Sequence, residues 1–283
     1  MLKELYRLTK PGIVYSNVMT AAAGFFVASN RSIRVGLLIE LLLAIALIIA
    51  SACTINNYID RGIDNHMERT KTRAIPSGRV SGKIALIYGA LLGILGFCIL
   101  VLFTNVTTSV LGIIAYIDYI VIYGWGKRHT VYGTLIGTIS GAIPPAAGYT
   151  AVSGHFNGVA IILFLILVFW QMPHFFAIAM YRLKDYEAAG LPVWPSKRGI
   201  NSTKHQMLFY IVAFTIASIT LTVFGITGRL FAGIAAALGA LWIWRGVADY
   251  HINDILWAKR MFFVSLIVLL VMSVNLSLGA RLP

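Results

Sequence analysis

The chain has few charged residues and few cysteines for its length. Only 12% of its 283 residues are charged, about half the share found in soluble domains. With 59% hydrophobic residues and a mean hydropathy of +0.83, this shortage excludes an ordinary water-soluble protein. The two cysteines, Cys53 and Cys98, lack CxxC or Cys/His spacing. We therefore expect no disulfide or zinc site, and two small buried apolar residues instead.

Long apolar runs make up most of the sequence. Runs of about 20 residues are long enough to cross a bilayer as helices, the structure that satisfies backbone hydrogen bonds in lipid. The sequence predicts an all-α integral membrane protein, a bundle of about nine transmembrane helices forming a single domain over residues 1–283. The nine predicted spans are Gly12–Ser29, Gly36–Asn56, Lys83–Phe103, Ser109–Trp125, Gly133–Val152, Gly158–Met180, Gln206–Gly225, Leu230–Ala248 and Met261–Leu278.

Acidic residues are scarce, and the formal net charge is +13. Such a charge could suggest nucleic acid, but basic residues beside membrane helices more often set topology. If the N-terminus is cytoplasmic, 19 of the 23 Lys and Arg fall in the N-terminal tail and the even-numbered loops. Those predicted outside are Arg31, Arg34, Arg229 and Arg281. The pattern favours no nucleic-acid partner, a cytoplasmic N-terminus, an outer C-terminus and a site facing the cytoplasm.

The loop after the second predicted helix opens with a regular acidic pattern. Asn56, Asp60 and Asp64 recur every four residues, so on a helix they share one stripe. Carboxylate and amide oxygens are ligands that Mg²⁺ accepts, commonly together with substrate phosphate oxygens. We interpret the three residues as metal ligands, with Asp60 and Asp64 catalytic and Asn56 also beside the diphosphate. An interfacial loop held by ion pairs is the alternative.

Basic residues follow within the same loop. Arg69, Lys71 and Arg73 could clamp the phosphate oxygens that a metal leaves uncovered. A crowd of acids and bases at one membrane edge fits a diphosphate better than a simple cation.

A second polar loop follows the sixth predicted helix. Tyr181, Arg182, Lys184 and Asp185 stand where that helix leaves the membrane. Asp185 could complete a second metal position, and Lys184 or Arg182 could neutralise a leaving diphosphate, with Tyr181 beside it. A solvated loop end is the alternative interpretation.

At these loops the sequence resembles the UbiA-type intramembrane prenyltransferase superfamily. That superfamily has an NxxxDxxxD motif after helix 2, matched here in full by Asn56, Asp60 and Asp64, and a second Asp motif after helix 6. The second motif departs from DxxxD, because Ala189 stands four residues after Asp185. The form DYxxAGxPxxP instead resembles the protoheme farnesyltransferase branch. Other segments that resemble this branch are Thr9–Ile13, Glu68–Gly78, Lys127–Tyr149 and Trp170–Phe175.

The resemblance implies a heme acceptor. His174 and Gln171 form a polar patch in an otherwise apolar helix, where His174 could bind or ligate the heme. Lys127 and Arg128 could hold its propionates. The alternatives are packing for His174 and a topogenic role for the two basic residues.

The reaction implied is transfer of farnesyl from farnesyl diphosphate to a vinyl group of heme b. A water or hydroxide finishes the reaction as a hydroxyethyl group, which gives heme O and diphosphate. Mg²⁺ is the implied cofactor, and heme b is a substrate rather than a prosthetic group. The resemblance also implies the bacterial cytoplasmic membrane, lipid contact, and a heme-copper terminal oxidase or heme A synthase that receives the product. The rivals are a prenyltransferase of the same fold for a quinone precursor or chlorophyllide, and a secondary transporter. Against a transporter, the polar groups collect at one membrane edge rather than near the midplane.

Overall fold

The computed structural model describes residues 1–29 and 32–279, and this part of the chain contains helices and no strand. Predictions that concern Arg31, Arg281 and Pro283 lie outside the described residues. The helices are α1 (Leu2–Leu8), α2 (Pro11–Ala28), α3 (Val35–Ile59), α4 (Arg61–Asp64), α5 (Gly82–Phe103), α6 (Val106–Ile117), the π-helix η1 (Asp118–Ile122), α7 (Tyr123–His129), α8 (Gly133–Ser153), α9 (Gly158–Tyr181), α10 (Leu183–Ala188), α11 (Trp194–Arg198), α12 (Ile200–Val223), α13 (Arg229–Ala248) and α14 (Asp254–Gly279).

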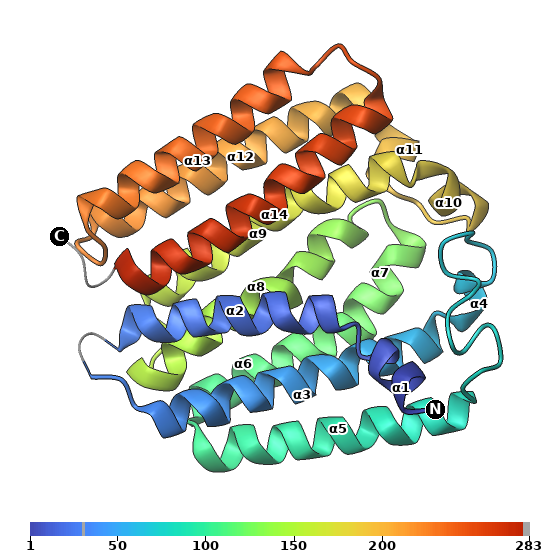
Figure 1. Ribbon diagram of the computed structural model, residues 1–283, viewed down its shortest axis with the longest axis horizontal. Coiled ribbons are helices and arrows are strands. Elements are labelled where there is room, and N and C mark those ends of the chain that lie inside the picture. Colours follow the sequence, from blue (N-terminus) through green and yellow to red (C-terminus); the bar gives the residue numbers. More distant parts are fainter. Residues whose placement is uncertain (30–31, 280–283) are drawn as a thin grey trace.

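Eight helical segments in the described part of the chain are long and apolar enough to cross a membrane. One of them, Val106–His129, runs continuously through α6, η1 and α7. Helix α8 is the ninth long helix and packs against α2, α6 and α9 inside the bundle (Figure 1). It is less apolar because it contains Thr, Ser, Gly and the internal prolines Pro144 and Pro145. The all-helical, multi-pass membrane architecture is therefore confirmed, with about nine long helices.

Two predicted helix starts were wrong by several residues. Helix α12 begins at Ile200 rather than Gln206, and α14 begins at Asp254 rather than Met261. Both helices start earlier because charged residues of their first turns are paired within the protein. Lys204 is buried in α12, donates to the Tyr250 carbonyl at 2.8 Å and pairs with Asp254 at 2.8 Å. A satisfied ammonium group can stay within a helix where an isolated one would favour the loop.

The two cysteines differ in their environments. Cys53 is buried, as expected, whereas Cys98 is exposed. The expectation for Cys98 was wrong because α5 lies on the outside of the bundle, with most of its surface facing away from the other helices (Figure 1). In a membrane protein an apolar residue of this kind contacts lipid without cost.

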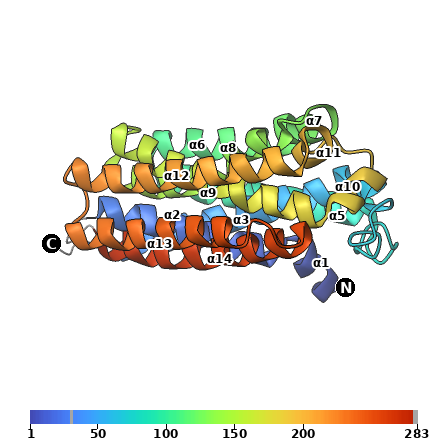
Figure 2. The same ribbon diagram turned by 90° about the horizontal axis from the view of Figure 1, so that it is seen from above.

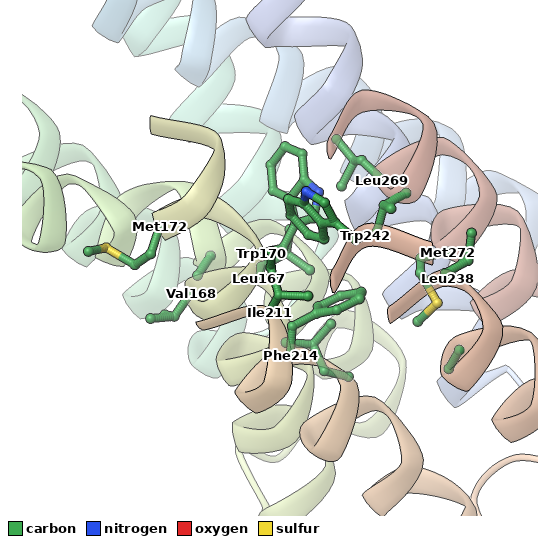
Figure 3. Close-up of a cluster of buried hydrophobic side chains, with 14 of the residues drawn as sticks. Leu167, Val168, Trp170, Met172, Ile211, Phe214, Leu238, Trp242, Leu269 and Met272 are labelled. Atoms are coloured by element: carbon green, nitrogen blue, oxygen red, sulfur yellow. The ribbon is translucent and has the colours of Figure 1, made fainter. Parts of the chain in front are cut away.

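Large side chains of α9, α12, α13 and α14 fill the main hydrophobic core (Figure 3). Trp170, Phe214 and Trp242 are all buried there. The Trp170 indole N–H is also satisfied, because it donates to the Ser265 carbonyl at 2.8 Å. This packing fixes the face of α9 that carries the next turn, including His174.

The short helices and polar loops gather at one end of the bundle. Figure 1 shows α1, α4, α10 and α11 at this end, and Figure 2 shows the long helices running side by side away from it. Within the described residues, the 65–81, 189–193 and 249–253 segments therefore adjoin the same membrane edge. We call this the polar end.

Candidate active site

The predicted acidic stripe lies at the polar end of α3. The Asp60 N–H donates to the Asn56 carbonyl at 2.9 Å, and the Asp64 N–H donates to the Asp60 carbonyl at 2.9 Å. Helical hydrogen bonding thus continues from α3 into α4 and keeps the three side chains on one side. All three line one cavity.

Asp60 is the centre of a buried polar network. Its Oδ2 accepts from Asn56 Nδ2 at 2.9 Å and from Lys127 Nζ at 2.5 Å, and its Oδ1 accepts from the Arg128 guanidinium at 3.1 Å. Lys127 also donates to Asn56 Oδ1 at 3.1 Å. The structure therefore places Lys127 and Arg128, which the sequence suggested for heme propionates, on the first acidic motif.

The carboxyl group of Asp60 is held in its charged form. Burial alone would raise its pKa, but the charge of Lys127 and its hydrogen bond outweigh burial, with Lys10 and Arg128 adding to the effect. The pKa of Asp60 consequently lies below its ordinary value. The carboxylate is anionic at neutral pH and available to a cation.

Asp64 is held by a different cation. Both of its carboxylate oxygens accept from one nitrogen of Arg73, at 2.9 and 2.8 Å, and the Thr70 hydroxyl donates to its carbonyl at 3.1 Å. Of the three basic residues predicted to clamp phosphate, Arg69 and Arg73 line the cavity. Lys71 instead pairs with Glu68 at 2.7 Å on exposed surface.

The cavity has a volume of about 810 Å³, within the range of small-molecule sites. Its polar end holds the residues just described, and the lining away from them is mostly apolar. Along α3 the lining runs from Asn56 to Ile45, roughly 16 Å at the helical rise. Leu100, Ala115 and Ile143 line the same apolar part. A ligand with an anionic head and a hydrocarbon tail matches this division.

The second polar loop contributes less of the lining. Tyr181 and Arg182 line the cavity. Among the residues that the structure describes, Asp185 and Lys184 do not line it. Asp185 lies 3.9 Å from Arg182, and Lys184 is exposed. Tyr186, which sequence reasoning missed, lines the cavity beside them.

His174 lines the same cavity from α9. Its ring stacks on Trp170 with centroids 4.9 Å apart and lies 4.9 Å from the Phe262 ring. Ser265 Oγ lies 2.5 Å from the Phe262 carbonyl and 2.7 Å from His174 Nδ1. In the tautomer that carries its proton on Nδ1, the imidazole N–H donates to this hydroxyl and Nε2 is unprotonated, which is the form that can bind iron.

Gln171 lies one turn before His174 and is fixed by two carbonyls. Its Nε2 donates to Leu167 at 3.0 Å and to Thr138 at 3.2 Å. A β-carbon at Gly141 would lie 2.1 Å from Gln171 Oε1, so a larger residue there would displace the Gln171 side chain. Gln171 thus lines the cavity through a tight α8–α9 contact rather than as a free side chain.

Sequence reasoning also missed Lys10, Tyr119 and Tyr123, which line the cavity. One signal was available, because Tyr119, Tyr123 and Lys127 recur every four residues. An α-helix would drift around its axis over that spacing, and the wider turn of η1 (Asp118–Ile122) compensates for it. The buried Asp118 anchors this segment by accepting the Ser140 N–H at 3.1 Å.

The donor set at the polar end fits Mg²⁺. Asn56 Oδ1 and the carboxylates of Asp60 and Asp64 are hard oxygen donors on one cavity wall. Among residues 1–29 and 32–279, no group of three or more His, Cys, Asp or Glu could hold a metal alone. A magnesium ion would therefore complete its shell with water and phosphate oxygens, as it commonly does.

The protein is an all-helical membrane bundle with carboxylates and cations at the polar end of a mostly apolar cavity. This arrangement defines an intramembrane enzyme site for an amphiphilic anion. A profile of the UbiA prenyltransferase family matches residues 17–267, and the chain belongs to this family.

Relatives match along the whole chain. The protein named protoheme IX farnesyltransferase from Citrobacter koseri is 42% identical, covering 100% of this chain and 96% of the relative. The protein of the same name from Photorhabdus laumondii is also 42% identical, covering 100% and 97%.

Solved structures share the fold. A digeranylgeranylglyceryl phosphate synthase structure has a TM-score of 0.80 at 19% identity, covering 99% of this chain and 98% of the other. A UbiA homolog from Archaeoglobus fulgidus bound to DMAPP and Mg²⁺ has a TM-score of 0.72 at 14% identity, covering 97% and 99%.

Proposed function

We propose that this protein transfers the farnesyl group of farnesyl diphosphate to a vinyl group of heme b, and that a water molecule adds to the resulting cation as a hydroxyl group, giving heme O and diphosphate. The observation that carries the proposal is the 42% identity, over the whole chain, to relatives named protoheme IX farnesyltransferase. The cavity supports it, because its lining combines cations such as Arg69 and Arg73, a series of apolar side chains, and His174.

Cations at the polar end of the cavity bind the diphosphate in this proposal. Asn56, Asp60 and Asp64 would hold Mg²⁺, which when bound neutralises phosphate charge and weakens the bond to the allylic carbon. Arg69, Arg73 and Arg182 line the same region and stabilise the charge that develops on the leaving oxygen. Such interactions strengthen in a site partly closed to water. Tyr181 lies beside them, and catalytic roles for Asp185 and Lys184 stay predictions.

Lys127 and Arg128 also support diphosphate binding in our proposal. Both donate to Asp60, so they hold its carboxylate in place and add positive charge beside the diphosphate. We therefore prefer this role to the propionate contacts that the sequence suggested.

The acceptor occupies the α9 wall in our proposal. His174 presents Nε2 for iron, while Trp170 and Phe262 hold its ring in place. The farnesyl chain lies along the apolar wall of α3 and α8. The two substrates then meet near the allylic carbon, from which diphosphate leaves toward the polar end.

Diphosphate release separates this proposal from its rivals. Purified protein is expected to release diphosphate from farnesyl diphosphate only when Mg²⁺ and heme b are both present. Release with a quinone precursor but not with heme b would identify the other prenyltransferase class. No release with either acceptor would favour a transporter.

We expect the polar end to face the cytoplasm of a bacterial cell. Reporter fusions should place Lys71, Lys127, Lys197 and Asp254 inside, as the basic residues suggest, and Pro283 outside. The first four positions belong to loops and helix ends at the polar end. A cytoplasmic C-terminus would contradict the nine-span topology. In this setting a heme-copper terminal oxidase or heme A synthase would receive the product.

Ser265 is expected to position His174. Ser265→Ala should weaken heme b binding about tenfold, since losing the partner of a ligand histidine commonly has that effect, and should shift the heme absorbance. The backbone stays anchored, because Trp170 donates to the Ser265 carbonyl rather than to its hydroxyl. Spectral titration measures both the affinity and the absorbance. Ser273→Ala is the matched control, because Ser273 is a buried serine of the same helix whose hydroxyl donates to the Leu269 carbonyl. Unchanged affinity and spectrum in Ser265→Ala would exclude this positioning role.

A further inference from the structure

Lys10 has an unusual backbone conformation at the polar end. It joins α1 to α2 with φ 51° and ψ 67° and is the only residue other than glycine with positive φ in the described part of the chain. A β-carbon makes this conformation unfavourable. Strain of this kind persists where surrounding structure enforces it, often at functional sites.

The side chain of Lys10 lines the active-site cavity. Within residues 1–29 and 32–279 its ammonium group makes no hydrogen bond or ion pair, whereas Lys127, Arg128 and Arg73 each hold a carboxylate. Burial is the largest influence on the Lys10 ammonium and lowers its pKa, while Asp60 and Asp64 act in the opposite direction. A partly buried cation with no partner calls for an anion from outside the protein.

The surroundings indicate which anion. Lys10 acts electrostatically on Asp60, Asp64 and Arg73, the residues of the first acidic motif and its clamp. Arg69 also lines the cavity and comes from the loop after α4, whereas Lys10 comes from the start of α2. His174, by contrast, belongs to the α9 wall.

We propose that Lys10 binds the diphosphate of the prenyl substrate directly, together with Arg69 and Arg73 of the same cavity. This inference rests on the proposed prenyl-transfer function and adds a residue to it. The ammonium group neutralises charge on the leaving diphosphate when the bond to the allylic carbon breaks, and no proton transfer is required. The unfavourable backbone is retained because the conformation delivers the side chain to this place.

Two substitutions separate a binding role from a structural one. Lys10→Met keeps the length of the side chain without its charge, and Lys10→Gly also removes the backbone strain. Isothermal titration of the purified full-length protein with inorganic diphosphate in the presence of Mg²⁺ should show affinity on the order of 10-fold weaker in both variants.

The melting temperature of Lys10→Gly should be within about 2 °C of the wild type or higher. Lys3→Met, an exposed lysine on the adjoining helix α1, is the matched control and should bind diphosphate normally.

The opposite pattern would overturn the inference. Unchanged diphosphate affinity in both variants, with a lower melting temperature in Lys10→Gly, would show that Lys10 is only structural. Weaker heme b binding with normal diphosphate binding would assign Lys10 to a propionate. Failure of the wild type to bind diphosphate with Mg²⁺ would count against the proposed function itself.

Discussion

Asp60→Ala is expected to reduce heme farnesylation by roughly 100- to 1000-fold, the loss typical of removing a central electrostatic group. The carboxylate is surrounded by Asn56, Lys127 and Arg128, and its side chain is only 12% exposed. Its removal takes away a metal ligand and leaves two cations without their carboxylate. Initial rates measured with heme b, farnesyl diphosphate and Mg²⁺ test this expectation.

Asp64→Ala should have a similar effect, because Arg73 would lose both of its contacts. Glu68→Ala is the control from the same loop, since this carboxylate is 81% exposed and pairs with the exposed Lys71. Both aspartate variants should still insert into the membrane, because no apolar helix face is lost. Near-normal rates in both would remove the acidic motif from the mechanism.

His174→Ala is expected to weaken heme b binding and farnesylation by about tenfold or more while leaving Mg²⁺-dependent farnesyl diphosphate binding nearly intact. The reason is that the acidic motif and His174 line the cavity from different helices, α3 with α4 and α9, which in our proposal hold different substrates. Loss of an iron ligand should also shift the heme absorbance, and added imidazole should partly restore the wild-type spectrum.

His205→Ala is the control for removing a histidine, because His205 is exposed on α12 and stacks on Tyr250. Normal heme affinity, an unchanged spectrum and normal farnesylation in His174→Ala would limit His174 to packing against Trp170 and Phe262. The acceptor site would then move toward Lys127, Arg128 and α8.

Local sequence patterns predicted most of the membrane helices. Apolar length alone placed spans such as Gly158–Met180 within a residue or two of the observed Gly158–Tyr181, because lipid leaves a long apolar segment no other regular structure. The helical stripe of Asn56, Asp60 and Asp64 also follows from local geometry.

Contacts between distant segments could not be predicted in this way. Lys127 and Asp60 are 67 residues apart, and their pairing depends on how α7 packs beside the end of α3. Lys204 was placed in a loop because its partners, Tyr250 and Asp254, come from another helix end. Lys10 lies in the Thr9–Ile13 segment that resembles the family branch, but its proposed role at the cavity follows from a backbone conformation that the sequence does not reveal.

The product of the complete reaction tests the central claim most directly. Membranes containing this protein, incubated with heme b, farnesyl diphosphate and Mg²⁺, are examined by mass spectrometry for farnesylated heme. Membranes with the Asp60→Ala variant, and wild-type membranes with a chelator in place of Mg²⁺, are the controls. We predict farnesylated heme, with the mass of heme O, only in the wild-type sample with Mg²⁺. Unmodified heme b in that sample, while a quinone precursor is prenylated under the same conditions, would contradict the assignment of heme as the acceptor.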